Sequence, residues 1–178
     1  MPGAESRKPA AKRIARLRVP LGFLFGAAAV MLSHPTPRSL MLGGIVGAAG
    51  EAVRVWAAGH LEKGREVTRS GPYRWTRHPL YAGSSIMAVG LAIASRSAIV
   101  SLLVVAYLVV TIGAAILTEE AHLTEKFGGE YDAYRQGTAT PVQRPFSLAR
   151  AIRNREYRAA LGFAVVLAIL ALRSRGVL

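Results

Sequence analysis

The sequence contains no cysteine and few acidic residues. Without cysteine it can form no disulfide bond, and it offers neither a thiol nucleophile nor a Cys ligand for zinc. Asp and Glu number only 10 against 23 Lys and Arg, which gives a formal net charge of +13. Charged residues make up 19% of the chain and hydrophobic residues 52%, which is too apolar for a water-soluble domain of 178 residues. The composition therefore predicts a chain that resides in the lipid bilayer.

Five apolar stretches are long enough, or nearly so, to cross a bilayer, which takes about 20 residues in a helix. They predict an all-α, polytopic membrane helix bundle with about five transmembrane helices. Residues 1–18 are expected to be a basic cytoplasmic tail, and residues 19–178 a single integral membrane domain. The five predicted spans run roughly from Val19 to Ser33, Leu40 to Ala58, Leu80 to Ala94, Ala98 to Thr118 and Tyr157 to Leu172.

Basic residues gather in three of the segments outside the predicted spans. Segments 1–18, 59–79 and 119–156 hold 6, 5 and 6 Lys and Arg. The segments that would lie on the opposite side hold only Arg38, Arg96, Arg173 and Arg175. By the positive-inside rule, the N-terminus and the long polar segments are expected at the cytoplasmic face. Because the charge is spread over three loops, we expect membrane lipids as partners and no nucleic acid.

The densest polar cluster beside a predicted span is the run GPYRWTRHPLY from Gly71 to Tyr81. Pro79 suits the first turn of a helix. The free backbone N–H groups at such a helix start, beside Arg77 and His78, would suit the carboxylate of an amino-acid-like ligand. The alternative interpretation is interfacial anchoring by aromatic and basic side chains.

Four further ionisable residues lie within or at the end of predicted spans. Glu119 and Glu120 end the fourth span, where a cationic ligand, a solvated helix end or pairing with Arg77 or Lys126 would each account for them. Glu51 and Arg54 lie three residues apart inside the second span, where a charge costs about 2.5–3.5 kcal/mol on insertion scales. They either pair with each other or form a polar wall of a substrate chamber. No glycine-rich dinucleotide motif is present, and no metal site is predicted.

Three blocks of the sequence resemble the isoprenylcysteine carboxyl methyltransferase family, which is itself similar to the membrane phospholipid N-methyltransferases. The blocks are SGPYRWTRHPLYAG, a fourth span that ends in EE, and FGGEYDAYR followed by Pro141, and together they cover about residues 54–145. The resemblance implies a helix bundle that binds S-adenosylmethionine at the cytoplasmic side, with its cofactor motifs within residues 59–145. By motif match, the cofactor-binding positions are His60, Val67, Thr68, Tyr73, His78, Pro79, Leu80, Tyr81 and Glu119.

The acceptor half of the site departs from this resemblance. The eukaryotic prenylcysteine enzymes carry a substrate-contacting arginine four residues before the first glutamate of the pair, and this sequence has Ala115 there. We expect methylation of a lipid-like acceptor, with carboxylate O-methylation favoured. A phospholipid amine N-methyltransferase, a non-catalytic membrane scaffold and a reductase with a similar bundle are the alternatives. The catalytic candidates are Glu120 and Arg77, and the substrate-binding candidates are Arg54 and Glu51.

Overall fold

The computed structural model describes residues 26–177, and the regular structure within them is entirely helical. The all-α prediction is therefore confirmed. The tail 1–18 and residues 19–25 of the first predicted span lie outside the described residues. Besides a helical stretch at residues 26–31, the elements are α2 (Pro37–Ala58), the 3-10 helix η1 (Gly71–Arg74), α3 (Pro79–Ser95), α4 (Ala98–Phe127), α5 (Gly129–Arg135), α6 (Leu148–Arg153) and α7 (Tyr157–Ser174).

Three of these helices, α2, α4 and α7, are long and apolar enough to cross a membrane. The fourth apolar helix, α3, has 17 residues. These four helices coincide with the second to fifth predicted spans. Large apolar side chains on α4 point outward, among them Leu102, which is 70% exposed, and Val109, which is 69% exposed. Such an apolar exterior suits contact with lipid tails, and the chain is an integral membrane protein.

Local sequence determines where the helices begin and end. Thr36 and Ser39 form a capping box before α2, in which each side chain accepts a hydrogen bond from the other residue's backbone N–H. Pro79 occupies the first turn of α3, as predicted. Gly128, with a φ of 49°, separates α4 from α5.

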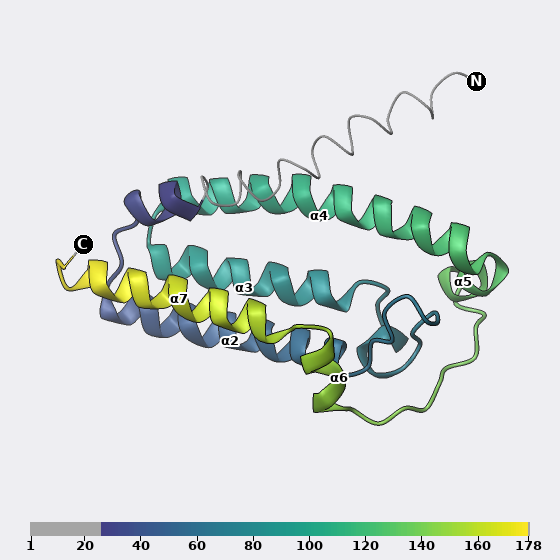
Figure 1. The fold of residues 1–178 in the computed structure, drawn as a ribbon. Coiled ribbons are helices and arrows are strands. Elements are labelled where there is room, and N and C mark those ends of the chain that lie inside the picture. The colour runs from purple at the N-terminus through teal and green to yellow at the C-terminus, as the bar shows by residue number, and fades with distance from the viewer. Residues whose placement is uncertain (1–25, 178) are drawn as a thin grey trace, which may run out of the picture.

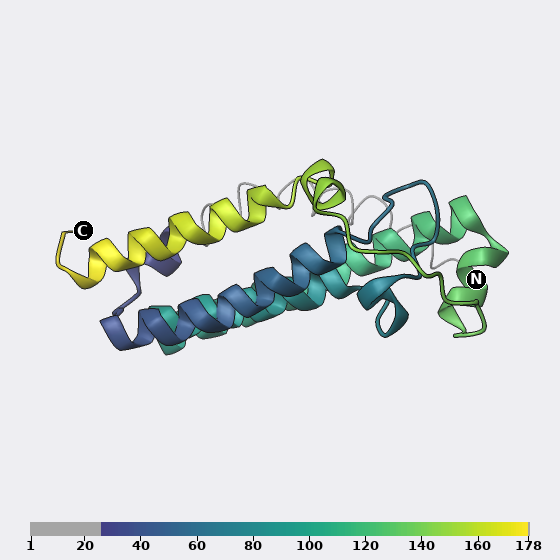
Figure 2. The same ribbon diagram turned by 90° about the horizontal axis from the view of Figure 1, so that it is seen from below.

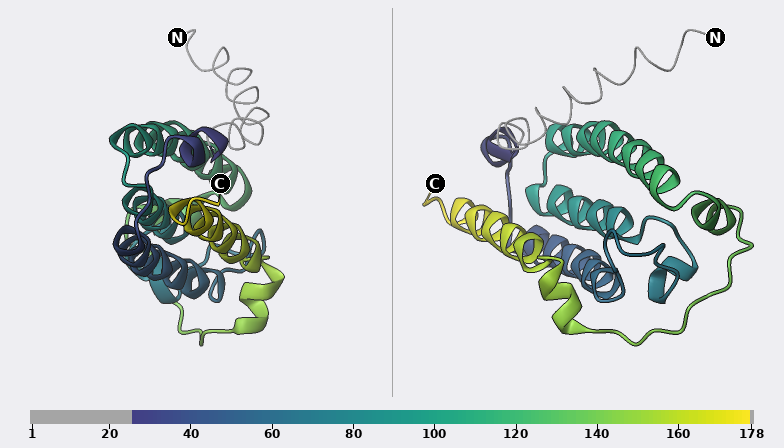
Figure 3. Two further views of the ribbon diagram at one scale, coloured as in Figure 1. Left: turned by 90° about the vertical axis from the view of Figure 1, so that its left-hand side faces the viewer. Right: turned by 45° about the vertical axis from the view of Figure 1, so that its right-hand side comes forward.

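Helices α2 and α3 form the most extensively packed pair, because glycines let their backbones approach closely. A Cβ atom on Gly83 would lie 2.7 Å from the carbonyl oxygen of Gly50, and one on Gly90 would lie 2.6 Å from that of Gly43. Small residues at such positions are typical of helix contacts in membranes. Figure 3 shows α2, α3 and α4 stacked one above another, with α7 beside them. Helices α3 and α4 are joined by a two-residue connection, but they pack less extensively than α2 and α3.

The connecting segments divide between the two ends of the bundle (Figure 1). Residues 59–78 and 128–156 lie at one end, called here the polar end. Residues 33–36 and 96–97 lie at the opposite end with the C-terminus. The loops that the positive-inside rule assigns to opposite sides of the membrane therefore lie at opposite ends of the molecule.

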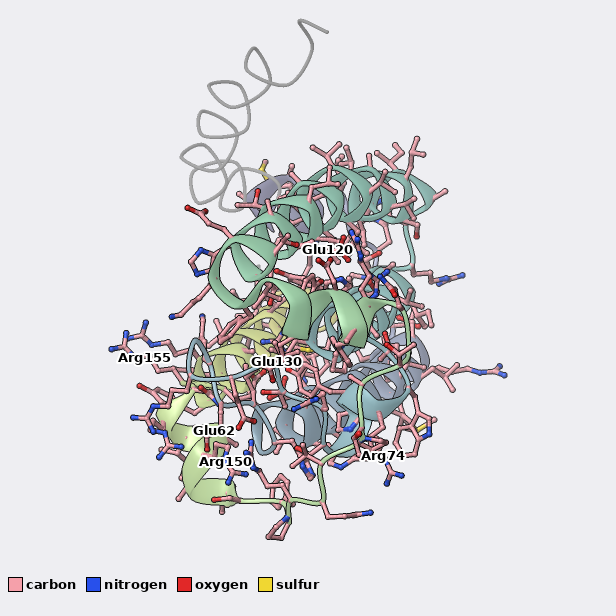
Figure 4. All side chains as sticks on the ribbon, turned by 90° about the vertical axis from the view of Figure 1, so that its right-hand side faces the viewer. Glu62, Arg74, Glu120, Glu130, Arg150 and Arg155 are labelled. Carbon is pink, nitrogen blue, oxygen red and sulfur yellow. The ribbon has the colours of Figure 1, made fainter. Side chains whose placement is uncertain are left out.

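The segment between α5 and α6 returns alongside the loop that follows α2 (Figure 2). Arg144 forms a two-pronged ion pair with Glu66, at 2.6 and 2.8 Å. Arg150 donates to Glu62 at 2.7 Å, and this hydrogen bond lowers the pKa of that carboxyl. Figure 4 shows Glu62 and Arg150 next to each other at this end. These ion pairs fasten the loop after α2 to the segment that returns from α5.

Candidate functional site

A cavity of about 670 Å³ lies at the polar end of the bundle. This volume is within the usual range of small-molecule sites, about 300–1,000 Å³. Four parts of the chain form its walls: the loop after α2, η1 with the start of α3, the second half of α4, and α5. Segments far apart in sequence therefore meet around one space.

Eight of the nine predicted cofactor positions line this cavity. These positions come from three stretches that are separate in the sequence, and the fold brings the three stretches together around the cavity. The catalytic candidate Arg77 and the substrate candidate Arg54 line it too. The eight cofactor positions are Val67, Thr68, Tyr73, His78, Pro79, Leu80, Tyr81 and Glu119.

The ninth predicted cofactor position, His60, lies outside the cavity lining. Its side chain is buried, with Nδ1 3.2 Å from the hydroxyl of Ser70 and its ring beside that of Phe146. Burial, followed by the charges of Arg150 and Arg144, lowers the pKa of His60 and favours its neutral form. The ring therefore joins the loop after α2 to the returning segment and does not face the cavity.

The two adjacent glutamates at the end of the fourth span have different surroundings. Consecutive residues point about 100° apart around a helix, so only one of them faces the cavity. Glu119 lines it, without an ion pair or hydrogen bond to any described residue. Glu120 lies outside the lining, with one oxygen 2.9 Å from Nη1 of Arg77 and 3.0 Å from Nε2 of His78. Glu120 therefore fixes two cavity side chains without facing the cavity itself.

The two charged residues of α2, Glu51 and Arg54, do not mainly pair with each other, which was one of the two sequence-based expectations. Arg54 lies 3.9 Å from Glu51 but only 2.6 Å from Glu156, at the start of α7. Its guanidinium also donates to the carbonyl oxygen of Leu80 and to the hydroxyl of Ser84. Arg54 thus joins α2, α3 and α7 at the cavity wall, whereas Glu51 lies outside the lining.

No pattern in the sequence indicated a role for Glu156. Glu156 lies 102 residues from Arg54 along the chain, and no sequence pattern connects residues that are so far apart.

The wall formed by α4 was not predicted either. Thr111, Ala114, Ala115 and Thr118 line the cavity, at the i, i+3, i+4 and i+7 positions of one helix face. This face is made of small side chains within a long apolar span, so it leaves space beside α3 at membrane depth. In the sequence, the two threonines within a run of Val, Leu and Ile are the feature that could have indicated this wall.

Helix α5 completes the cavity through two tyrosines. The hydroxyl of Tyr134 donates to the carbonyl oxygen of Tyr73 at 2.7 Å, which fastens α5 to η1. Burial raises the pKa of Tyr134 to about 12 and raises that of Tyr131 as well, so both phenols are neutral at physiological pH. In the sequence both tyrosines belong to the FGGEYDAYR block, which by itself does not show that they lie beside the motif around His78.

Comparison with known families indicates a class of enzyme. Residues 48–130 match the model of the phospholipid methyltransferase family. No curated protein and no solved structure matches the chain. The helical fold and the match support a place among the membrane methyltransferases. The chain is a methyltransferase, and its methyl donor is S-adenosylmethionine.

The side chains around the cavity fit this donor, which combines a sulfonium, an ammonium and a carboxylate with an adenosine. Glu119 offers an uncompensated negative charge for a cationic group. Arg77 and Lys63 offer positive charge for a carboxylate. The aromatic rings of Tyr73 and Tyr81 offer faces that attract cations and stack on flat rings.

Proposed function

We propose that this chain transfers the methyl group of S-adenosylmethionine to a lipid-soluble acceptor at the cytoplasmic face of the membrane. The observation that carries the proposal is the composition of the cavity walls. One wall consists of polar loops and α5, and another is the small-residue face of α4, a helix long enough to span the bilayer. A water-soluble donor can reach the first wall from the aqueous phase, and a lipid can reach the second from the bilayer.

Bound S-adenosylmethionine would supply an electrophilic methyl group on a positively charged sulfur. The chain's task is then to align the reactants and to exclude water. In the proposed site, Glu119 faces the positive charge of the donor. Glu120 holds His78 and Arg77 in place, and Glu156 does the same for Arg54.

We propose a carboxylate as the first candidate for the acceptor group, as in methyltransferases of isoprenylcysteine type. A carboxylate is already ionised near pH 7 and requires no general base. Three basic side chains line the cavity, those of Arg54, Lys63 and Arg77, against the two acidic ones of Glu66 and Glu119. Since Arg54, Arg77 and Glu66 already pair with Glu156, Glu120 and Arg144, Lys63 is the basic side chain that we assign to an anionic acceptor.

The second candidate acceptor is a phospholipid amine. The family match favours it, and Ala115 leaves the α4 wall without the arginine of the prenylcysteine pattern. An amine must lose a proton during methylation, which a neutral imidazole can accept. His78 lines the cavity and is held by Glu120, so it is the base that we assign in this case.

Methyl-labelled S-adenosylmethionine distinguishes the two acceptors. The purified protein is incubated in liposomes with a lipid extract, and in parallel with a water-soluble extract. We expect label in the lipid fraction, and release of that label by mild base identifies a methyl ester. Retention through base treatment identifies an N-methyl product and replaces the first candidate with the second. Label confined to the water-soluble fraction would contradict the lipid acceptor.

A further inference from the structure

One buried hydroxyl of the cavity has no acceptor for its proton. Tyr131 is only 1% exposed, yet it lines the cavity, and no described residue accepts a hydrogen bond from its hydroxyl. Leaving a buried hydroxyl unsatisfied costs about 1–3 kcal/mol. The other side chains with such atoms, Glu51 and Arg69, do not line the cavity. The unsatisfied hydroxyl of Tyr131 thus coincides with the place where a ligand would bind.

The position of Tyr131 is well fixed by the contacts of α5. The hydroxyl of Tyr134, one turn further along, bonds to η1, and the two tyrosine rings lie 6.2 Å apart. Glu130, the preceding residue, pairs with Arg69 at 3.2 Å. Contacts on both sides of Tyr131 therefore fasten the short helix, so the unsatisfied hydroxyl is a feature of a constrained element.

The surroundings of Tyr131 indicate which ligand group it would meet. Its phenol is neutral, so the hydroxyl can donate a hydrogen bond to an oxygen of the ligand. Arg77 lines the same cavity, and it acts on the phenol both through its charge and as a donor toward the phenol oxygen, which leaves the phenolic proton free for a ligand. Only one of its nitrogens is engaged by Glu120, and a guanidinium has five N–H donors. A neutral donor beside a cation that keeps free donors suits a carboxylate.

We propose that Tyr131 and Arg77 together bind the carboxylate of the donor's amino-acid part. Glu119, on the α4 side of the cavity, then faces the ammonium and sulfonium of the same ligand. This inference rests on the proposed function, and it adds a ligand-binding residue from α5 that lies beyond the matched residues 48–130.

The test compares two ligands that differ in the amino-acid part. S-adenosylhomocysteine carries the carboxylate, and 5′-methylthioadenosine keeps the nucleoside and thioether but lacks it. Binding of both to the detergent-purified protein is measured by calorimetry, or by competition with labelled S-adenosylhomocysteine where affinity is low. In Tyr131→Phe we expect affinity for S-adenosylhomocysteine to fall about tenfold, since a charge-assisted hydrogen bond is lost. Affinity for 5′-methylthioadenosine should stay unchanged.

Matched controls separate this outcome from a change in folding. Tyr157→Phe removes a hydroxyl from an exposed tyrosine outside the cavity, and both affinities should match those of the wild type. Arg77→Gln should reproduce the selective loss for S-adenosylhomocysteine. An equal loss for both ligands in Tyr131→Phe, or no loss, overturns the assignment to the carboxylate. A folded wild type that binds neither ligand would instead contradict the proposed function.

Discussion

The adjacent carboxylates of Glu119 and Glu120 have different surroundings. Glu119 has no pairing partner among the described residues, and Glu120, the next residue, holds both Arg77 and His78. A side chain without partners adds little to stability, so its presence at the cavity is best explained by a ligand. A side chain with two charged or polar partners fixes the geometry of the site. The two carboxylates can therefore be separated by experiment.

Glu119→Gln should weaken binding of S-adenosylmethionine by about tenfold, because a charge-assisted contact is lost. Thermal stability of the unliganded protein should stay within about 0.5 kcal/mol of wild type, as for surface changes generally. Glu120→Gln should lower stability by about 1–3 kcal/mol, because it removes a charged partner from Arg77 and His78. Calorimetry and thermal unfolding in detergent measure the two effects. Reversal of the pattern would contradict these roles.

The motif residues of the site were predictable because they are close in sequence. The run from Tyr73 to Tyr81 contains six cavity residues and extends from η1 into the start of α3. Contacts between distant segments were not predictable. Glu156 reaches Arg54 only through the packing of α7 against α2, and Tyr131 reaches the cavity only because α4 ends at Gly128. A single sequence does not indicate which distant segments come into contact in the fold.

At the scale of elements, hydropathy was sufficient to place the helices. The predicted span from Leu80 to Ala94 became Pro79–Ser95, and that from Tyr157 to Leu172 became Tyr157–Ser174. The fourth span is the exception, since the helix continues from the predicted end at Thr118 to Phe127. Hydropathy marks where a helix leaves an apolar medium, but the hydrogen-bonded helix continues beyond it until Gly128 allows the turn.

The α2–α3 contact offers a test of how the elements position the site. Gly90→Val should lower stability by about 1–3 kcal/mol through overpacking, because the new side chain meets the backbone of α2. Since α3 begins with the residues that line the cavity, binding of S-adenosylhomocysteine should weaken as well.

Gly113→Val is the matched control for this change. It lies within α4, and a Cβ there would meet nothing within 4 Å. Thermal unfolding and ligand binding of this variant should resemble those of the wild type. Equal tolerance of both substitutions would show that the close approach of α2 and α3 is not required.

For the whole molecule, the remaining issue is which end faces the cytoplasm. The cavity lies at the polar end, together with the loops 59–78 and 128–156. Those loops carry 10 Lys and Arg, and they belong to two of the three segments that the positive-inside rule assigns to the cytoplasm. We therefore propose a cytoplasmic polar end, where the donor, a product of cytoplasmic metabolism, is available.

The absence of cysteine makes this orientation directly measurable. Thr138→Cys places a thiol on an exposed residue of the polar end, and Val177→Cys places one on a 65% exposed residue at the opposite end. In intact cells, a membrane-impermeant maleimide should label Val177→Cys and leave Thr138→Cys unlabelled. After permeabilisation it should label both. The reverse pattern in intact cells would place the cavity outside the cell, where S-adenosylmethionine would have to be exported before it could be used, and would contradict the proposed cytoplasmic site.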